Sequence, residues 1–217
     1  MRFRLLCIAW RNNRLLFLLP FIVLYLVLPI VTISAAANQN LDVSWRLFVF
    51  VLQTLAPLSI LFWQMAYLNI WLDEEGEECI RGSSVRKKTA VGEIFLSVIL
   101  YAIISLPVFL VAHLFFDTAY LEWLRLVSTA IFFVNVYFLL SLVFRSLIVS
   151  SMLVFAYAFF SILYHGDGAL KHLCLLTPRI AVSLEKMVSL YAPLAIVSAL
   201  LLVLGGVIER CFHYYLA

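Results

Sequence analysis

The chain has 217 residues, of which 65% are hydrophobic and only 12% are charged, and its formal net charge is +3. A soluble domain averages about 45–50% apolar and about 25% charged residues, so this composition excludes a soluble globular protein. No run of basic residues is long enough for a nucleic-acid-binding arm. Lipid must therefore be the solvent for much of the chain.

The first twelve residues have the pattern of an amphipathic helix. Four apolar residues share one helical face: Phe3, Leu6, Cys7 and Trp10. Arginines fall on another face, as they do in helices that lie in the membrane interface. We therefore predict an interfacial helix over residues 1–12, with a plain basic flank before the first membrane span as the alternative.

Six segments have the length and apolar character of membrane spans, each needing about 20 residues. They are 15–34, 47–72, 94–116, 124–144, 147–164 and 188–208. The first could instead be the apolar part of a secretory signal peptide, but it exceeds the usual length of about 7–15 residues. We predict an all-α polytopic membrane protein in which residues 1–217 form a single transmembrane domain.

The basic residues and the cysteines predict the orientation of these spans. Two thirds of the 15 Lys and Arg lie on the side of the two termini and of segment 73–93. Basic residues favour the cytoplasmic side, so both termini are expected in the cytoplasm. Cys7, Cys79 and Cys211 then lie near the reducing side and Cys174 lies alone outside, which predicts no intrachain disulfide.

Segment 73–93 after the second span has an acidic half and a basic half. The acidic half contains Glu74, Glu75, Glu77 and Glu78, and the basic half contains Arg81, Arg86, Lys87 and Lys88. One interpretation is a solvated loop whose basic residues fix the topology. The other is a short helix that offers charges to a soluble partner, because Glu74, Glu77 and Glu78 could share one face.

The external loop at residues 165–187 is expected to form two short helices that are broken at Pro178. It also contains residue types that bind metals, namely His165, Asp167, His172 and Cys174. Their spacing matches no known metal motif, so we predict no metal site.

Within the membrane, the span centres contain no Asp, Glu, Lys or Arg, and the polar side chains there include Gln53, Gln64, Asn69 and Asn135. Such side chains either join helices by hydrogen bonds or line a transport pathway. Ion-coupled transporters usually need ionisable residues or broken helices at this depth. The chain also lacks a phosphate-binding Gly-x-x-x-x-Gly-Lys-Ser/Thr loop, so any energy must enter from another protein. We predict no catalytic residue and no cofactor in this chain.

The order of these elements resembles the type-2 ABC transporter permease family. The resemblance consists of the amphipathic start, six spans, the acidic-then-basic segment at residues 73–93 and the Pro178 segment before the last span. In local sequence it is confined to residues 73–93 and 174–187. Gly76 is followed by Glu77, whereas the family usually has a Gly-Thr pair with a Glu soon after it.

The resemblance implies a function. Two such subunits, identical or homologous, would form the pathway, and two cytoplasmic ATPase subunits would bind ATP and Mg beneath them. Residues Glu74, Glu75, Glu77, Glu78 and Arg81 would form the ATPase-coupling helix. The chain would then be a multi-pass protein of a bacterial cell membrane that exports a peptide or another amphipathic compound.

Two other classes of protein stay open. A non-transporting membrane protein with an immunity, assembly or sensor role would need no ATPase. An intramembrane protease of the CAAX type is suggested by Phe109-x-x-x-His113 and by Glu77-Glu78-x-x-Arg81, which is one residue shorter than the family motif. The predicted topology places those two motifs at opposite membrane faces, about 30 Å apart.

Overall fold

The computed structural model describes residues 10–11, 13–38, 41–72, 90–164, 176 and 183–215. Regular structure in this part of the chain is entirely helical. Five of the helices are long and apolar enough to cross a membrane: Arg14–Ser34, Val43–Asn69, Val91–His113, Ala119–Phe144 and Met187–Cys211. A further apolar helix, Leu147–Leu163, has 17 residues and corresponds to the fifth predicted span. The count of six spans therefore stays a prediction.

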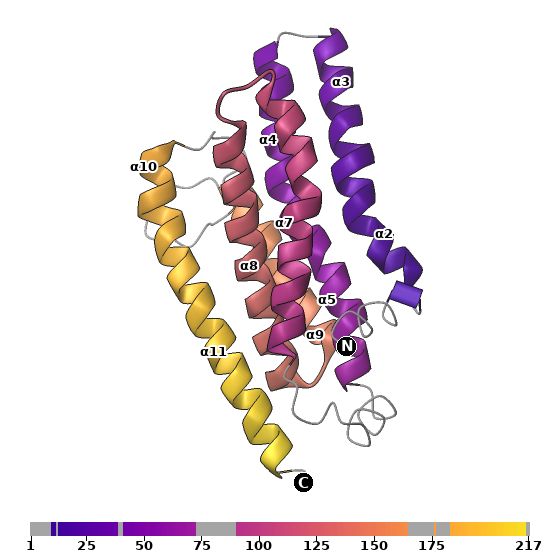
Figure 1. Cartoon of the computed structure of the whole chain (residues 1–217), viewed down its shortest axis with the longest axis vertical. Helices are drawn as coiled ribbons and strands as arrows, with labels where there is room; N and C mark the ends of the chain where they lie inside the picture. Colours follow the sequence, from indigo (N-terminus) through magenta and orange to yellow (C-terminus); the bar gives the residue numbers. More distant parts are fainter. Residues whose placement is uncertain are drawn as a thin grey trace.

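The helices form a bundle of long rods (Figure 1). In chain order they are α2 (Arg14–Ile22) with η1 (Val23–Val27) and α3 (Leu28–Asn38), α4 (Leu41–Thr54) with α5 (Ala56–Leu72), α7 (Val91–His113), α8 (Ala119–Phe144), α9 (Leu147–Leu163), and α10 (Leu184–Lys186) with η4 (Met187–Tyr191) and α11 (Ala192–Tyr215). Consecutive rods run in opposite directions, so α2 begins and α11 ends toward the same end of the bundle (Figure 1).

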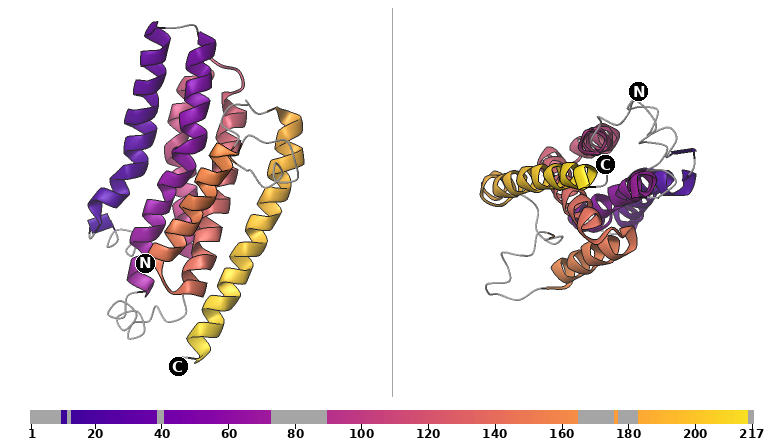
Figure 2. Two further views of the ribbon diagram at one scale, coloured as in Figure 1. Left: turned by 180° about the vertical axis from the view of Figure 1, so that it is seen from behind. Right: turned by 90° about the horizontal axis from the view of Figure 1, so that it is seen from below.

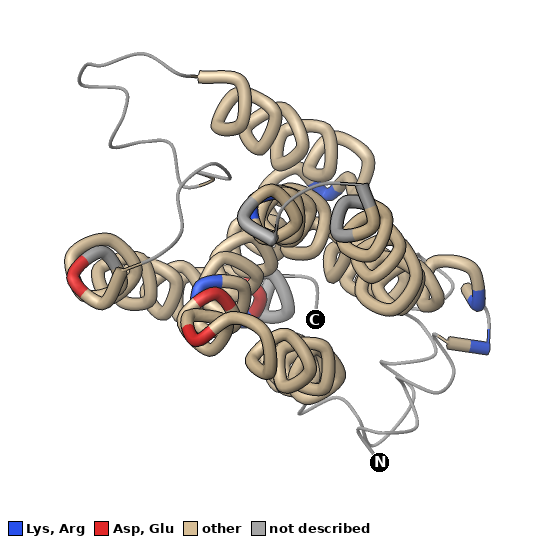
Figure 3. Tube along the Cα trace, turned by 90° about the horizontal axis from the view of Figure 1, so that it is seen from above, with Lys and Arg blue, Asp and Glu red and all other residues tan. Residues whose placement is uncertain are grey.

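The rod of α4 and α5 lies at the centre, and the first and last rods lie outside it on opposite sides (Figure 2). In the central rod, 78% of the most apolar stretch of Val43–Asn69 is buried, against 22% for Arg14–Ser34 and 17% for Met187–Cys211. Seen along the bundle, charged residues in the described part are few among long uncharged stretches (Figure 3). The exposed apolar faces of the outer rods are the surface expected to meet lipid.

The last rod packs along α8. A Cβ atom added at Gly205 would lie 2.6 Å from Cε1 of Phe138, a ring that is itself fully buried. The absence of a side chain at this position therefore lets the backbone of α11 approach α8 closely, which is a common role of small residues between membrane helices.

The irregularities of the rods occur next to prolines. The π-helical turn η1 lies between Pro20 and Pro29, and the π-helical turn η4 comes just before Pro193. In the central rod, Leu55 stands between α4 and α5, two residues before Pro57, and helical hydrogen bonds continue across it from Leu55 N–H to the Val51 carbonyl and from Ser59 N–H to the Leu55 carbonyl. Proline has no backbone N–H to donate and its ring crowds the preceding turn, so a kink or a π-helical turn there has a local cause.

Several helices extend beyond the predicted spans, and the bounds of the spans themselves stay a prediction. Helices α4, α7 and α8 begin at Leu41, Val91 and Ala119, where the sequence analysis began the spans at residues 47, 94 and 124. The last rod is helical from Leu184 rather than from residue 188. Polar residues such as Glu93 and Glu122 ended the predicted spans, whereas the structure buries both of them within the first helical turns.

Three predicted elements fall largely outside the described residues. Of the expected interfacial helix 1–12, Trp10 and Arg11 are described and are helical. Of segment 73–93, only residues 90–93 are described. Of the external loop 165–187, the structure describes Leu176, which is buried, and residues 183–187, which lead into the last rod.

Candidate functional site

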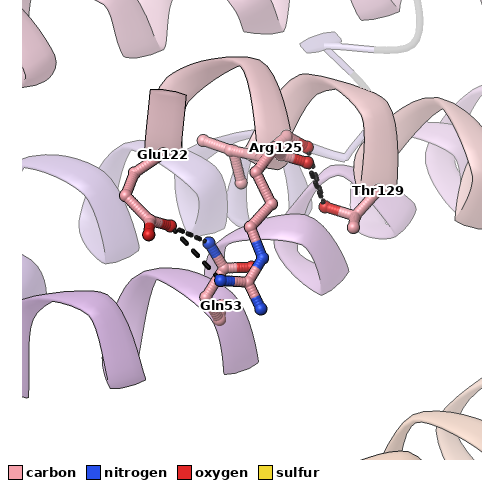
Figure 4. A network of polar contacts seen from close by, with 5 residues as sticks. Gln53, Glu122, Arg125 and Thr129 are labelled. Atoms are coloured by element: carbon pink, nitrogen blue, oxygen red, sulfur yellow. Dashed lines mark hydrogen bonds and ion pairs between the residues drawn. The ribbon is translucent and has the colours of Figure 1, made fainter. Parts of the chain in front are cut away.

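A buried ion pair lies in the first two turns of α8. Glu122 and Arg125 are one helical turn apart and both are fully buried, with Nη1 of Arg125 3.6 Å from Oε2 of Glu122. The same carboxylate oxygen accepts a hydrogen bond of 2.6 Å from Nε2 of Gln53 on α4 (Figure 4). Charged side chains are almost never fully buried unless they are paired in this way.

The guanidinium of Arg125 also faces an aromatic ring. Its central carbon lies 5.6 Å from the centroid of the Tyr191 ring, which belongs to η4. A cation over an aromatic face within about 6 Å is attracted by about 2 kcal/mol when both groups are desolvated. We call Gln53, Glu122, Arg125 and Tyr191 together the ion-pair site, and it joins three rods of the bundle.

The ion-pair site lies inside the central rod but near the beginning of α8, where Glu122 is about 5 Å from the Ala119 end at roughly 1.5 Å per residue. At roughly 1.5 Å per residue, Gln53 is about 15 Å from the Val43 end of its span and about 24 Å from the Asn69 end. A charge within a membrane span is costly and is usually paired and directed into the interior of the bundle. The arrangement satisfies both conditions, because Glu122 and Arg125 compensate each other.

Local structure places each of these side chains. Glu122 lies in the first turn of α8, where the partial positive charge of the helix N-terminus favours a carboxylate. The neighbouring Trp123 donates its Nε1–H to Oγ of Ser105 at 3.1 Å, which ties the start of α8 to α7. Thr129 Oγ1 donates to the backbone carbonyl of Arg125 at 2.9 Å (Figure 4).

The ion-pair site was not predicted from the sequence. The sequence shows no Asp, Glu, Lys or Arg at the span centres, whereas the structure buries Glu122 and Arg125 together near the beginning of α8. The spacing of Glu122 and Arg125 was the available signal, because opposite charges three residues apart are neighbours on a helix. Their position at the edge of an apolar run made them look like ordinary flanking charges.

A second polar feature follows one face of α7. It consists of four buried polar residues, each one turn from the next: Glu93, Ser97, Tyr101 and Ser105. Gln64 on α5 donates to the hydroxyl of Ser97, and Tyr101 donates to the backbone carbonyl of Ala56. The face of α7 that meets the central rod is therefore polar and hydrogen-bonded, and hydrophobic packing alone does not hold it there.

The four predicted pathway residues are distributed over different helix contacts. Gln53 bonds to α8, and Gln64 bonds to α7. Asn135 donates from α8 to the backbone carbonyl of Ser198 on α11, with a length of 2.9 Å. All three are buried, whereas Asn69 is exposed. Among them, only Gln53 belongs to the ion-pair site.

The other predicted residues fall elsewhere. The coupling residues Glu74, Glu75, Glu77, Glu78 and Arg81 lie outside the described part of the chain, as do His165, Asp167, His172 and Cys174. His113 is exposed, and its ring meets the edge of Tyr120 at a centroid distance of 6.4 Å. The described residues contain no group of three His, Cys, Asp or Glu that could hold a metal ion.

No protein-family model, no curated protein and no solved structure matches this chain. Membership of the type-2 ABC transporter permease family therefore stays a prediction.

Proposed function

We propose that this chain is the membrane-spanning permease subunit of an ATP-driven transporter whose ATPase is a separate protein. The observation that carries this proposal is the ion-pair site. Hydrogen bonds between neutral side chains are sufficient to join membrane helices. A buried charge pair is more costly, and charged residues inside a membrane typically mark a moving or conducting element.

The helix irregularities next to the ion-pair site support the same function. The central rod has a local irregularity at Leu55, two residues after Gln53, and the last rod contains the π-helical turn that presents Tyr191. Kinks in helices have identifiable local causes, among them prolines and π-helical turns. π-helical turns are also frequent at functional sites.

The internal charge balance supports a separate source of energy. Glu122 and Arg125 neutralise each other, so together they offer no net charge that would bind a coupling ion. ATP and Mg would then be bound by a partner ATPase, and segment 73–93, with Glu74, Glu75, Glu77, Glu78 and Arg81, would dock on it. Closure of the ATPase pair would shift the membrane helices between two arrangements.

The remaining parts of the proposal follow the family resemblance. The chain would cross a bacterial cell membrane six times with both termini in the cytoplasm and would pair with a second permease subunit, identical or homologous. The transported compound would be a peptide or another amphipathic molecule that is exported.

Purification of the tagged chain from its native membrane tests this proposal. We expect a cytoplasmic ATPase subunit to co-purify, the chain alone to hydrolyse no ATP, and the complex to show hydrolysis in proteoliposomes. Reversal of Glu74, Glu77 and Glu78 to Lys should leave membrane insertion intact and weaken ATPase binding, with Glu185→Lys on α10 as the control. ATP hydrolysis by the isolated chain, or a triple reversal that binds the ATPase normally, would contradict the proposal.

A non-transporting role is the second candidate, and one observation favours it. Gln53, Gln64 and Asn135 each make a hydrogen bond across a helix contact, as is typical of a bundle that keeps one shape. If the chain co-purifies with no ATPase and with a different membrane protein, an assembly or immunity role would replace the transport role.

A further inference from the structure

At the opposite end of the last rod from Tyr191, a buried carboxylate contacts the beginning of α7. Oε1 of Glu209 accepts a hydrogen bond of 2.7 Å from the backbone N–H of Ala90, a residue 119 positions earlier in the chain. The side chain of Glu209 is only 4% exposed. Ala90 is the N-cap residue of α7 and is the first described residue after segment 73–89.

The chemistry of a helix N-terminus explains this contact. The first backbone N–H groups of a helix have no partner inside the helix, and a Ser, Thr, Asp or Asn at the N-cap usually accepts from one of them. Ala90 has no side-chain acceptor, so no side chain of its own caps α7. Glu209 supplies an acceptor from another helix, and its negative charge is favourable at this position.

Close packing brings the two helices together at the same place. A Cβ atom added at Gly206 would lie 3.2 Å from Cγ2 of Val91, so the backbone of α11 passes close to the first turn of α7. The contact of α11 with α7 is small compared with its contact with α8. The hydrogen bond from Ala90 to Glu209 is therefore a principal connection between α7 and the last rod in the described part of the chain.

The last rod connects this contact with the ion-pair site. Tyr191, which faces Arg125, and Glu209 are separated by about 27 Å of helix at roughly 1.5 Å per residue. Tyr191 is the last residue of η4 and Glu209 lies on α11, the regular helix that follows directly, so a displacement of the start of α7 can be transmitted through Glu209 along α11 to Tyr191. Rigid secondary elements with contacts at both ends are suitable carriers of such coupling.

We propose that Glu209 is a positioning residue that couples the end of segment 73–93, the segment proposed to dock on the ATPase, to the last membrane helix, and through that helix to the ion-pair site. This inference rests on the proposed function for the identity of the docking partner. The contact between Glu209 and Ala90 is itself independent of that partner and can be measured in the isolated chain.

Amide hydrogen exchange at residues 90–93, measured for the full chain in lipid nanodiscs, tests the contact. Glu209→Gln keeps an oxygen that can accept a hydrogen bond from the Ala90 N–H, so the amide exchange rate at residues 90–93 should stay near that of the wild type. Glu209→Asp keeps the charge with a shorter reach, and its exchange should be about tenfold faster, which is the effect of losing a hydrogen bond of ordinary strength. Val203→Ala, at an exposed position on the same helix, is the matched control and should change nothing.

Coupling is then measured with the co-purified ATPase. Glu209→Asp should bind the ATPase as tightly as the wild type and lose most of the stimulation of ATP hydrolysis by transported compound, whereas Glu209→Gln should retain that stimulation. A merely structural role would lower both binding and stimulation together.

The possible failures are distinguishable. Equal amide exchange rates at residues 90–93 in Glu209→Asp and in the wild type would show that the hydrogen bond from Ala90 to Glu209 is absent, and would overturn this inference. Faster exchange with unchanged stimulation would overturn the coupling role while leaving the contact in place. If no ATPase binds the wild type, the proposed function fails, and the coupling role fails with it, even where the exchange data still verify the hydrogen bond.

Discussion

Replacement of Arg125 by alanine should be one of the most destabilising single changes in this protein. The pair distance of 3.6 Å gives an attraction of about 4–5 kcal/mol at an effective dielectric constant of about 20. Alanine removes this attraction and also the contact with the Tyr191 ring, and it leaves the Glu122 carboxylate buried. Removal of one partner from a buried ion pair costs about 3–5 kcal/mol, so we expect Arg125→Ala to lower the free energy of unfolding by that amount.

The measurement is reversible unfolding of the purified chain in mixed micelles, followed by circular dichroism as denaturing detergent is added. Arg46→Ala is the matched control, because Arg46 lies on α4 and is exposed. Its substitution should change the free energy of unfolding by less than about 0.5 kcal/mol.

A double variant separates the loss of the pair from the loss of packing. Glu122→Gln combined with Arg125→Met removes both charges and keeps similar volumes, so it should recover most of the stability lost in Arg125→Ala. A loss below about 1 kcal/mol in Arg125→Ala would mean that the pair is solvated as surface pairs are. That result would refute the assignment of the ion-pair site as a desolvated element.

Three further predictions concern packing and topology. Gly205→Ala should destabilise the chain by about 1–3 kcal/mol, because the new methyl group would meet Phe138 at 2.6 Å. Gly206→Ala should destabilise it less, because the nearest atom to the new methyl group is 3.2 Å away, and thermal unfolding in detergent compares the two variants. Asn135→Leu should cost about 0.6 kcal/mol and at most about 1.7 in the same assay, because one interhelical hydrogen bond is lost, and a larger loss would indicate a wider network. A cysteine at Asn38 should react with a membrane-impermeant thiol reagent in intact cells, and reaction only after permeabilisation would reverse the predicted orientation.

The sequence was sufficient to predict where the helices lie, because apolar runs of membrane length have few alternatives in lipid. Helix ends were predicted less well. Glu93 and Glu122 are polar in sequence and were assigned to loops, yet each is buried in the first turn of a helix, and Glu122 accepts a hydrogen bond from Gln53, 69 positions earlier in the chain. Tertiary contacts of this kind leave no local signal.

The same limit applies to the ion-pair site. The spacing of Glu122 and Arg125 on one helical face could be read from the sequence, but the contribution of Gln53 from α4 and of Tyr191 from η4 could not. Both depend on how the central rod and the last rod pack against α8. The contact of Glu209 with Ala90 spans 119 positions and was likewise inaccessible to sequence patterns.

The distribution of polar contacts indicates which rods can move. The central rod is joined to α7 and α8 by hydrogen bonds at several depths, including those of Gln64 and Gln53, and most of its apolar stretch is buried. The first and last rods are mostly exposed, and each contains a π-helical turn that presents a tyrosine to the bundle. Tyr25 donates to the backbone carbonyl of Ile104, and Tyr191 faces Arg125. A shift of an outer rod would therefore break fewer polar contacts and uncover less packed surface than a shift of the central rod. The outer rods are accordingly the elements whose displacement costs the least free energy.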